Sequence, residues 1–320
     1  GGTSPCRRGG RASPGLFRSM FGAPGRRSDG RRSRPARAAA RPGVDLVVLG
    51  LAEGDLVRLR REGFRVRADR AIGQGRLVQL AAPARLSSRR ALGRVAQGAP
   101  AAVADLNHSY RLQQSPSLCT ARICSTWSLI EWSAAVGAAC SPEVTIGVID
   151  TAVDVGNEAL AGSKVEVLSV ASDGRPKSGA RHGTAVVAML VGAPDGPAPG
   201  LLPQARVVAV DSFAREGNQE RADAFGLLVA LDLLAARQIK VVNLSLAGPD
   251  NRILARSVAD LVGAGTTLVA AVGNDGPRSA PLYPASYPGV IGVTAVDAKL
   301  QVYRRAARGG AHQRPGPGRV

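Results

Sequence analysis

The pattern of apolar and polar positions separates an irregular start of the chain from two regular parts. Residues 1–43 consist mainly of Arg, Gly, Pro, Ser and Ala and show almost no periodic apolar pattern. Such a composition cannot bury enough apolar surface to offset the entropy of the chain, so we expect a disordered segment. Mistranslated sequence would have the same texture.

From residue 44 the pattern becomes regular. Alternating apolar runs predict strands at 44–49, 64–67 and 76–80, and amphipathic stretches predict helices at 53–62 and 88–97. This order of elements is typical of a small ferredoxin-like α+β unit, which we assign to residues 44–110. We assign residues 111–142 to a connector that contains cysteines.

The second regular part, residues 143–303, alternates apolar runs with amphipathic helices. The predicted strands are 144–149, 206–210, 240–246, 267–272 and 290–296, and the predicted helices are 184–191, 221–236 and 252–263. Runs of Val, Ile and Ala that are apolar on both faces indicate parallel strands covered by helices on both sides. We therefore expect an α/β fold whose functional groups collect at the ends of the strands.

The charge of the chain is concentrated near its two ends. The chain has 42 Lys and Arg against 24 Asp and Glu, a net charge of +18. Eleven Arg and a single acid lie in residues 1–43, and five Arg without an acid lie in residues 304–320. The remainder is close to neutral and has no nucleic-acid-binding motif, and no aromatic residues are interleaved with the basic residues of a tail. We therefore expect no nucleic-acid partner, although tail-mediated binding by an Arg-rich segment is an alternative.

No apolar run reaches the roughly 18 residues that a membrane-spanning helix needs, so we expect no membrane partner. Three of the four cysteines, Cys119, Cys124 and Cys140, cluster, whereas Cys6 stands apart. Three interpretations stay open: a local disulfide that joins Cys119 or Cys124 to Cys140, a metal site, or small buried thiols. We expect no metal, because no His or paired Cys of zinc-ligand spacing accompanies the cluster.

Four polar or glycine-containing sequences stand where predicted strands end or helices begin. Asp150 follows the strand 144–149, and His182 opens a helix. A carboxylate held at the end of a buried strand suits the orientation of an imidazole. The segment Leu246, Ala247 and Gly248 could pair with an extended peptide by strand addition.

Asn274 lies in a glycine-bracketed turn after another strand. Its amide could donate a hydrogen bond to a developing oxyanion. Taken singly, each of these residues has a simpler interpretation: Asp150 as a turn or cap residue, His182 as a structural histidine, Asn274 as an ordinary turn residue. The four together, in this order, favour a catalytic site.

Residues 144–297 resemble the subtilisin-like serine peptidases, or subtilases. The Asp-Thr/Ser-Gly motif of that family appears as Asp150-Thr151-Ala152, its His-Gly-Thr-His motif as His182-Gly183-Thr184-Ala185, and its Ala-Ala-Gly-Asn segment as residues 270–274. Residues 283–297 read Tyr-Pro-Ala-Ser-Tyr-Pro-Gly-Val-Ile-Gly-Val-Thr-Ala-Val-Asp, close to another stretch of the family. Residues 44–110 resemble, more weakly, the inhibitory propeptide of such enzymes.

The resemblance implies a subtilisin-like parallel sheet preceded by a propeptide-like unit, and a serine endopeptidase that acts on peptides or proteins. It makes Asp150 the orienting acid, His182 the general base, Asn274 the oxyanion donor and residues 246–248 the edge that holds the substrate backbone. It further implies a secreted or periplasmic monomer without a cofactor, with structural calcium left open. Ala152 and Ala185 depart from the motifs, and Ala152 matters only if its position requires a positive φ.

The family's nucleophilic serine lies in a Gly-Thr-Ser motif beyond the position of residues 283–297, yet no Ser follows Ser286 in this chain. Without that hydroxyl, acyl transfer by the usual route cannot occur. We therefore expect a truncated or frameshifted inactive form, with an incomplete sheet. The alternative is a non-catalytic pseudo-peptidase that binds peptides or a protein partner.

The basic tail 304–320 has a Gly, Pro and Arg texture typical of a GC-rich gene read in the wrong frame. Back-translation of residues 310–320, read one nucleotide later, permits Ala-Pro-Gly-Val among many solutions, and subtilases often carry that sequence there. We expect resequencing of the gene to reveal a frameshift near codons 308–310, with a Gly-Thr-Ser motif restored downstream. An intact frame that ends in a genuine stop codon after residue 320 would contradict this expectation.

Overall fold

A computed structural model describes residues 43–113, 144–170, 175–296 and 299–307, which all belong to one compact unit, residues 41–320. The expectations for residues 1–42, for the cysteines Cys6, Cys119, Cys124 and Cys140 and for residues 308–320 concern positions outside these ranges.

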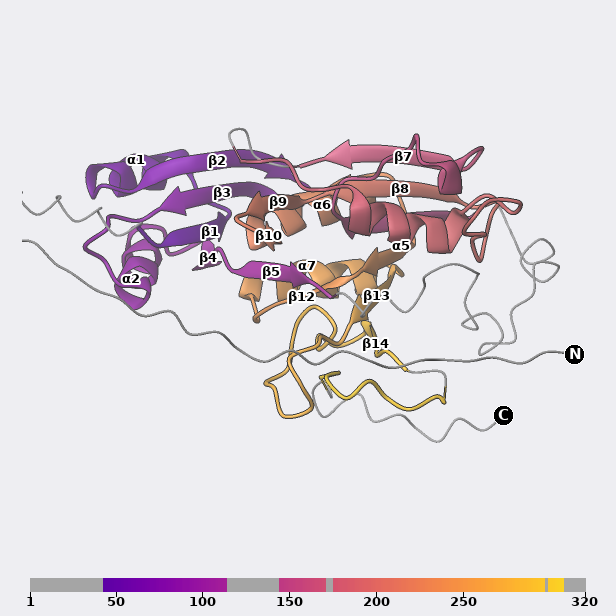
Figure 1. The fold of residues 1–320 in the computed structure, drawn as a ribbon. Helices are drawn as coiled ribbons and strands as arrows, with labels where there is room; N and C mark the ends of the chain where they lie inside the picture. The colour runs from indigo at the N-terminus through magenta and orange to yellow at the C-terminus, as the bar shows by residue number, and fades with distance from the viewer. Residues whose placement is uncertain (1–42, 114–143, 171–174, 297–298, 308–320) are drawn as a thin grey trace, which may run out of the picture. The chain divides into compact units, whose positions relative to one another are not determined.

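The first regular part forms a four-stranded antiparallel sheet with two helices. Its elements are β1 (Asp45–Leu49), α1 (Glu53–Arg61), β2 (Arg65–Ile72), β3 (Gly75–Ala81), α2 (Ser88–Gly98) and β4 (Val103–Leu106). The strand order is β2-β3-β1-β4, as Figure 1 shows in indigo and purple. The βαββαβ order is that of the expected ferredoxin-like unit. Its last strand, β4, was not among the predicted strands.

The period of two along β1 divides its side chains between two cores. Leu46 and Val48 pack in one cluster with apolar residues of α1 and α2. Val47 and Leu49 belong to a second cluster, which contains Phe225 and other residues of the helix Ala224–Ala236. Because both faces of this sheet are covered, every apolar residue from 46 to 49 is buried.

The second regular part forms a six-stranded parallel sheet. Its strands are β6 (Thr145–Asp150), β7 (Lys164–Ser169), β8 (Arg206–Asp211), β11 (Val241–Leu244), β13 (Thr267–Ala271) and β14 (Ile291–Val293), in the order β14-β13-β11-β6-β8-β7. A short 3-10 helix, η1 (Glu158–Leu160), lies between β6 and β7. This sheet confirms the expected α/β class.

Helices cover the two faces of this sheet in different ways. Val148 of β6 and Ala209 of β8 share a cluster with Val187 and Val191 of α5 (Arg181–Val191). Ile149 points to the other face, where it shares a cluster with residues of α6 (Ala224–Ala236) and α7 (Arg252–Gly263). The alternation along β6 therefore places α5 on one face and α6 and α7 on the other.

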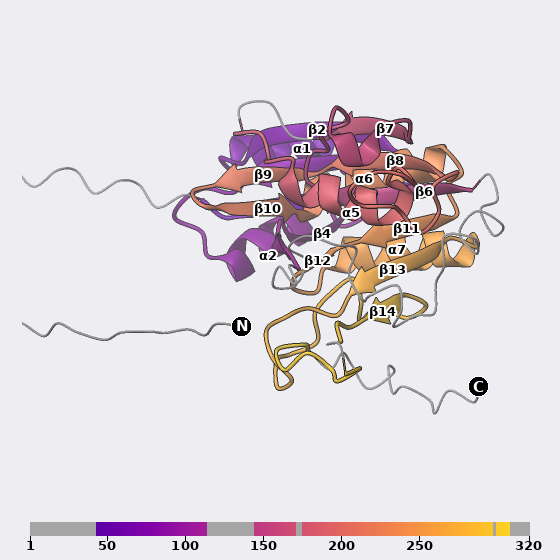
Figure 2. The same cartoon turned by 45° about the vertical axis from the view of Figure 1, so that its right-hand side comes forward.

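A third sheet joins segments that lie far apart in the sequence. Its order is β12-β5-β10-β9, where β5 is Ser109–Leu112, β9 is Phe213–Glu216, β10 is Gln219–Asp223 and β12 is Leu246–Ala247. Both neighbours of β5 are antiparallel to it. Figure 1 shows β5 directly after the ferredoxin-like unit and beside β12, and Figure 2 shows β9 and β10 side by side.

The structure corrects three predicted elements and adds a strand to the parallel sheet. The helix predicted at 221–236 begins only at Ala224, because Asp223 caps it by accepting from the Gly226 amide at 2.8 Å and the preceding residues form β10. The strand predicted at 240–246 ends at Leu244, and β12 follows as a separate strand. The last strand is shorter than 290–296, and β7 was not predicted.

Polar contacts join the ferredoxin-like unit to α6 and α7. The turn between β2 and β3 bonds to both helices: the Gly73 amide donates to Asp232 at 2.7 Å, and Gln74 donates to Asp260 at 2.6 Å. At the start of α7, Asp105 accepts from the Arg252 amide at 2.8 Å. In each of these contacts, a carboxylate of one part accepts a hydrogen bond from a backbone or side-chain amide of the other part.

Asn251, the N-cap of α7, forms the centre of this junction. It is fully buried, and its Oδ1 accepts from the Ile253 and Leu254 amides at 3.1 and 3.0 Å. Its Nδ2 donates to the Leu106 carbonyl at 2.9 Å, and its own amide donates to the Tyr287 hydroxyl at 3.0 Å. One side chain thus caps a helix and ties two parts of the chain together.

We expect Asn251→Ala to lower the free energy of unfolding by about 2 kcal/mol or more, because it removes a cap and leaves buried polar groups unpaired. The matched control is Ser87→Ala at the N-cap of α2, where a single 3.4 Å bond to the Arg90 amide is lost. We expect the control to cost about 0.5 kcal/mol. Denaturant unfolding of both variants measures the difference, and equal losses would contradict this account of the junction.

Candidate active site

Asp150 ends the buried strand β6, between β11 and β8. Its side chain is 1% exposed, and its Oδ1 accepts from the Thr151 amide at 2.7 Å. Its carbonyl accepts from the Ser212 amide at 3.1 Å. Neighbouring strands and backbone donors thus fix the carboxylate in one position.

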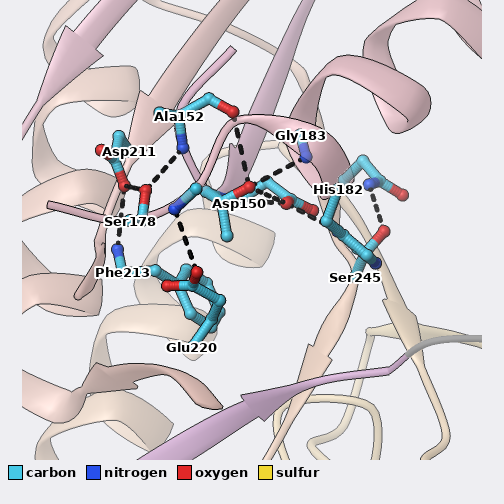
Figure 3. A network of polar contacts seen from close by, with 12 residues as sticks. Asp150, Ala152, Ser178, His182, Gly183, Asp211, Phe213, Glu220 and Ser245 are labelled. Atoms are coloured by element: carbon cyan, nitrogen blue, oxygen red, sulfur yellow. Dashed lines mark hydrogen bonds and ion pairs between the residues drawn. The ribbon is translucent and has the colours of Figure 1, made fainter. Parts of the chain in front are cut away.

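His182 lies in the first turn of α5, and its Nδ1 is 2.7 Å from Oδ1 of Asp150. Figure 3 shows the two side chains directed toward one another. A carboxylate can only accept a hydrogen bond, so Nδ1 carries the proton in this pair. In the neutral imidazole, Nε2 then keeps a lone pair that can accept a proton.

Gly183 allows the helix to approach the loop after β6. A Cβ at this position would lie 2.5 Å from the carbonyl oxygen of Thr151 and 2.6 Å from that of Ala152. The close approach lets the Gly183 amide donate to Thr151 Oγ1 at 2.9 Å, and Thr184 Oγ1 accepts from the Asp154 amide at 2.8 Å. These contacts bring His182 to Asp150.

Ala152 stands where the family motif has a glycine, and its backbone does not adopt a positive φ. Among the described residues, only Gln238 and Leu300 have a positive φ without being glycine. The Ala152 amide donates to Ser178 Oγ at 2.8 Å. The absence of the family's glycine therefore leaves the loop after Asp150 unstrained.

Ser178 and Asp211 support that loop from its other side. Ser178 donates to Asp211 Oδ1 at 2.9 Å, and the Phe213 amide donates to the same oxygen at 3.1 Å (Figure 3). Burial raises the pKa of Asp211, and the hydrogen bonds from Ser178 and Phe213 partly offset this effect. The nearby carboxylates of Glu220 and Asp150 raise the pKa further.

Asn274 follows β13, which pairs in parallel with β11, the neighbour of β6. The carboxyl ends of β13 and β6 therefore lie at the same edge of the sheet, with β11 between them. Gly273 adopts φ +99°, and a Cβ there would lie 2.3 Å from Leu282. A glycine is thus required for the turn that carries Asn274.

The edge at residues 246–248 is already paired with an extended segment of the same chain. Leu246 is paired with Leu112 and Ala247 with Arg111, both in β5. Gly248 pairs instead with Tyr283 in an isolated bridge. The sequence suggested that this edge binds an extended peptide, but not that residues 109–112 occupy it.

Within the described ranges, no three His, Cys, Asp or Glu side chains form a group that could hold a metal ion. No helix among the described residues is long and apolar enough to cross a membrane.

The family model described as "Subtilase family" matches residues 141–315. This chain belongs to the subtilase family. The match contains Asp150, His182 and Asn274 and confirms the resemblance seen in the motifs. The distances given above are thus those of a subtilase domain.

Curated proteases match about half of the chain. The minor extracellular protease Epr of Bacillus subtilis strain 168 is 29% identical over 177 residues, 55% of this chain and 27% of the relative. The subtilisin-like protease 1 of Trichophyton verrucosum is 31% identical over 163 residues, 48% of this chain and 39% of the relative. The chain therefore matches well under half the length of these curated relatives.

A solved structure supports the fold over a longer range. Fervidolysin from Fervidobacterium pennivorans, titled a keratinolytic enzyme related to subtilisin, superposes with a TM-score of 0.64 at 16% identity. The match covers 85% of this chain and 46% of that one. The subtilisin-like fold is therefore shared, including the parallel sheet that carries Asp150.

The raised pKa of Asp211 predicts a pH dependence of stability. The native state binds the proton of this carboxyl more tightly than the unfolded state does. The stability contributed by Asp211 is therefore greatest at acid pH and falls as the pH rises through the raised pKa. We expect Asp211→Asn, which can still accept from Ser178 and Phe213, to gain stability relative to the unaltered chain between about pH 4 and pH 7.

Denaturant unfolding at a series of pH values measures this gain. The matched control is Asp195→Asn, at an exposed position. A stability difference for Asp211→Asn that stays constant across the range would contradict the raised pKa.

Proposed function

We propose that this subtilase site is that of a serine-type endopeptidase acting on peptides or proteins. The observation that carries the proposal is the 2.7 Å contact between His182 Nδ1 and Asp150 Oδ1. The paired edge at β12, which already binds an extended segment, supports a polypeptide substrate. The names of the relatives, an extracellular protease and a subtilisin-like protease, agree with it.

In the proposed mechanism, His182 Nε2 takes the proton of a serine hydroxyl as its oxygen attacks the substrate carbonyl carbon. Asp150 holds the Nδ1–H tautomer and stabilises the imidazolium that forms. The Asn274 amide would donate to the oxyanion of the tetrahedral intermediate. His182 then returns the proton to the leaving amine, and water hydrolyses the acyl-enzyme by the same route in reverse order.

We propose further that residues 44–110 act as the inhibitory, propeptide-like part. Their sheet shares a core with α6, and β5, which begins at Ser109 at the end of this range, lies on the edge proposed to hold substrate. A segment held there would compete with any other peptide for the same backbone hydrogen bonds.

No Ser follows Ser286 in the 320-residue sequence, so this chain offers no nucleophile at the place where the family has one. We propose that the chain in this form is inactive. We also propose a secreted or periplasmic monomer that needs no cofactor and binds neither nucleic acid nor membrane.

We expect the purified chain to give no burst with an activated peptide ester and no covalent adduct with a serine-directed phosphonate. If the gene carries the proposed frameshift, the product of the corrected frame should be labelled and should hydrolyse peptides. His182→Ala in that product should lower kcat by several orders of magnitude, since the base is lost. Labelling of the 320-residue chain, or full activity of the His182→Ala product, would contradict the proposal.

A second candidate function is that of a pseudo-peptidase that only binds peptides. It is favoured by the β5–β12 pairing, which involves no catalytic side chain. A cooperative thermal unfolding transition of the 320-residue chain would support it, whereas a molten, aggregating chain would indicate a broken gene product.

A further inference from the structure

Five arginines gather at one end of the ferredoxin-like unit, which we call the basic end. Arg61 ends α1, and Arg65 begins β2. Arg85 lies between β3 and α2, and Arg89 and Arg90 lie in the first turn of α2. All five residues are exposed.

Contacts between these elements bring the five arginines to the same end of the unit. The strands β2 and β3 lie side by side, and β2 begins where β3 ends, because Arg65 is paired with Ala81 (Figure 1). The turn after α1 lies against the loop that leads to α2, since a Cβ at Gly63 would lie 3.2 Å from Cγ of Pro83. The arginines of two helices, a strand and a loop therefore share one part of the surface.

The carboxylates of this end of the unit do not neutralise the five arginines. Glu62 pairs with Arg94 at 3.8 Å, and Asp45 pairs with Arg67 at 3.4 Å, so both acids already have other partners. Among the residues that the structure describes, none of the five arginines forms an ion pair with a carboxylate. Like charges that gather in this way repel one another and favour the approach of an anion.

The start of α2 strengthens this positive field. The N-terminus of a helix carries a partial positive charge, which favours acidic side chains in the first turn. The first turn of α2 contains no acid but holds Arg89 and Arg90. These two arginines therefore do not stabilise the helix that carries them, whereas an anion bound to them would.

The basic tails and a second copy of the chain do not supply the missing negative charge. Residues 1–42 contain a single acid, Asp29, and residues 308–320 contain none. A second copy carries the same net charge of +18 and is repelled. The partner that these charges fit is therefore a separate polyanion.

The side chains of the unit distinguish between classes of polyanion. Guanidinium groups bind carboxylates and sulfates through two parallel hydrogen bonds. Residues 43–113 contain two aromatic residues, Phe64 and Tyr110, and both are buried, so no ring is available to stack on a nucleic-acid base. Arginines without exposed aromatic residues suit a polymer whose charged groups repeat along the chain and whose sugar rings carry no bases.

We infer that the basic end binds a linear acidic polysaccharide through its carboxylate or sulfate groups. This surface adds a binding activity to the proposed peptidase activity and contains none of the residues of the proposed catalytic site. In a secreted or periplasmic protein, the location proposed above, it would hold the chain on an acidic polysaccharide matrix.

The test measures the binding of the full-length chain to immobilised alginate, a polyuronate, and to heparin, a sulfated polysaccharide. Surface plasmon resonance at about 0.15 M salt gives the affinities. The triple variant Arg85→Gln, Arg89→Gln, Arg90→Gln should bind the preferred polysaccharide about tenfold or more weakly, because three charge-assisted contacts are lost. The dependence of its affinity on salt should also become shallower. A stronger effect on alginate identifies carboxylate as the recognised group, and a stronger effect on heparin identifies sulfate.

The matched control is the triple variant Arg206→Gln, Arg256→Gln, Arg278→Gln. These three arginines are also exposed, but they lie apart from one another on β8, on α7 and in the loop after β13. The control loses the same charge and keeps both basic tails, so it corrects for binding by total charge. Its affinity should fall about twofold or less, and both variants should keep the thermal unfolding transition of the unaltered chain, because every substitution is at an exposed position.

Equal losses of affinity in the two variants, or no binding to either polysaccharide, would overturn the inference. A DNA duplex and vesicles that contain phosphatidylserine test the other classes of polyanion. If the substitutions at the basic end weakened binding to DNA or to vesicles more than binding to the polysaccharides, the assignment to a polysaccharide would be wrong.

This inference and the proposed function can fail separately, because binding is measured without catalysis. Loss of the polysaccharide result would leave the roles of Asp150 and His182 untouched. A corrected-frame product that failed to hydrolyse peptides would likewise leave the binding of the basic end unchanged.

Discussion

The burial of β6 in the middle of a parallel sheet is the constraint on which the rest of the site depends. Both faces of the strand are covered by helices and both edges by strands, so its last residue cannot shift without disturbing the core. Asp150 occupies that last position. His182 is aligned against it by Gly183, and the following loop is held by the Ser178–Asp211 contact.

The same edge of the sheet positions β12. β11 ends beside β6, and the chain continues from it into β12, so the edge proposed to hold substrate is positioned by the same sheet as Asp150. β5 reaches this edge directly from the ferredoxin-like unit, whose sheet packs into the core that contains α6. The contact between Asp150 and His182 and the pairing of β5 with β12 therefore both depend on one packing arrangement.

The sequence predicted the buried elements best. Strands such as β6 and β8 are continuous apolar runs, and their pattern has few alternatives. The short strands of the third sheet were missed, because β5 and β10 are four and five residues long and mostly polar. The partner of β5 in this sheet, β10, lies over a hundred residues away in the sequence. β7 alternates Val with Lys and Glu, a signal that a period-two search could have found.

The candidate site was predictable where a residue carries its own chemistry. Asp150, His182, Asn274 and the edge 246–248 could be picked out by residue type and position. Thr151, Ser178 and Asp211 could not, because their roles arise from contacts such as the one between Ser178 and Asp211, 33 residues apart. The burial of Tyr110 likewise could not be predicted, because it depends on its pairing with Ala222, over a hundred residues away.

The central claim is that Asp150 fixes the imidazole of His182 with its proton on Nδ1 and its lone pair on Nε2. The chain has only three histidines, so 15N-labelled histidine gives a simple long-range 1H–15N NMR spectrum. For the neutral ring the account predicts the Nδ1–H tautomer, and its loss as the dominant form in Asp150→Ala. A His182 ring in the Nε2–H tautomer, or one unaffected by the loss of Asp150, would contradict it.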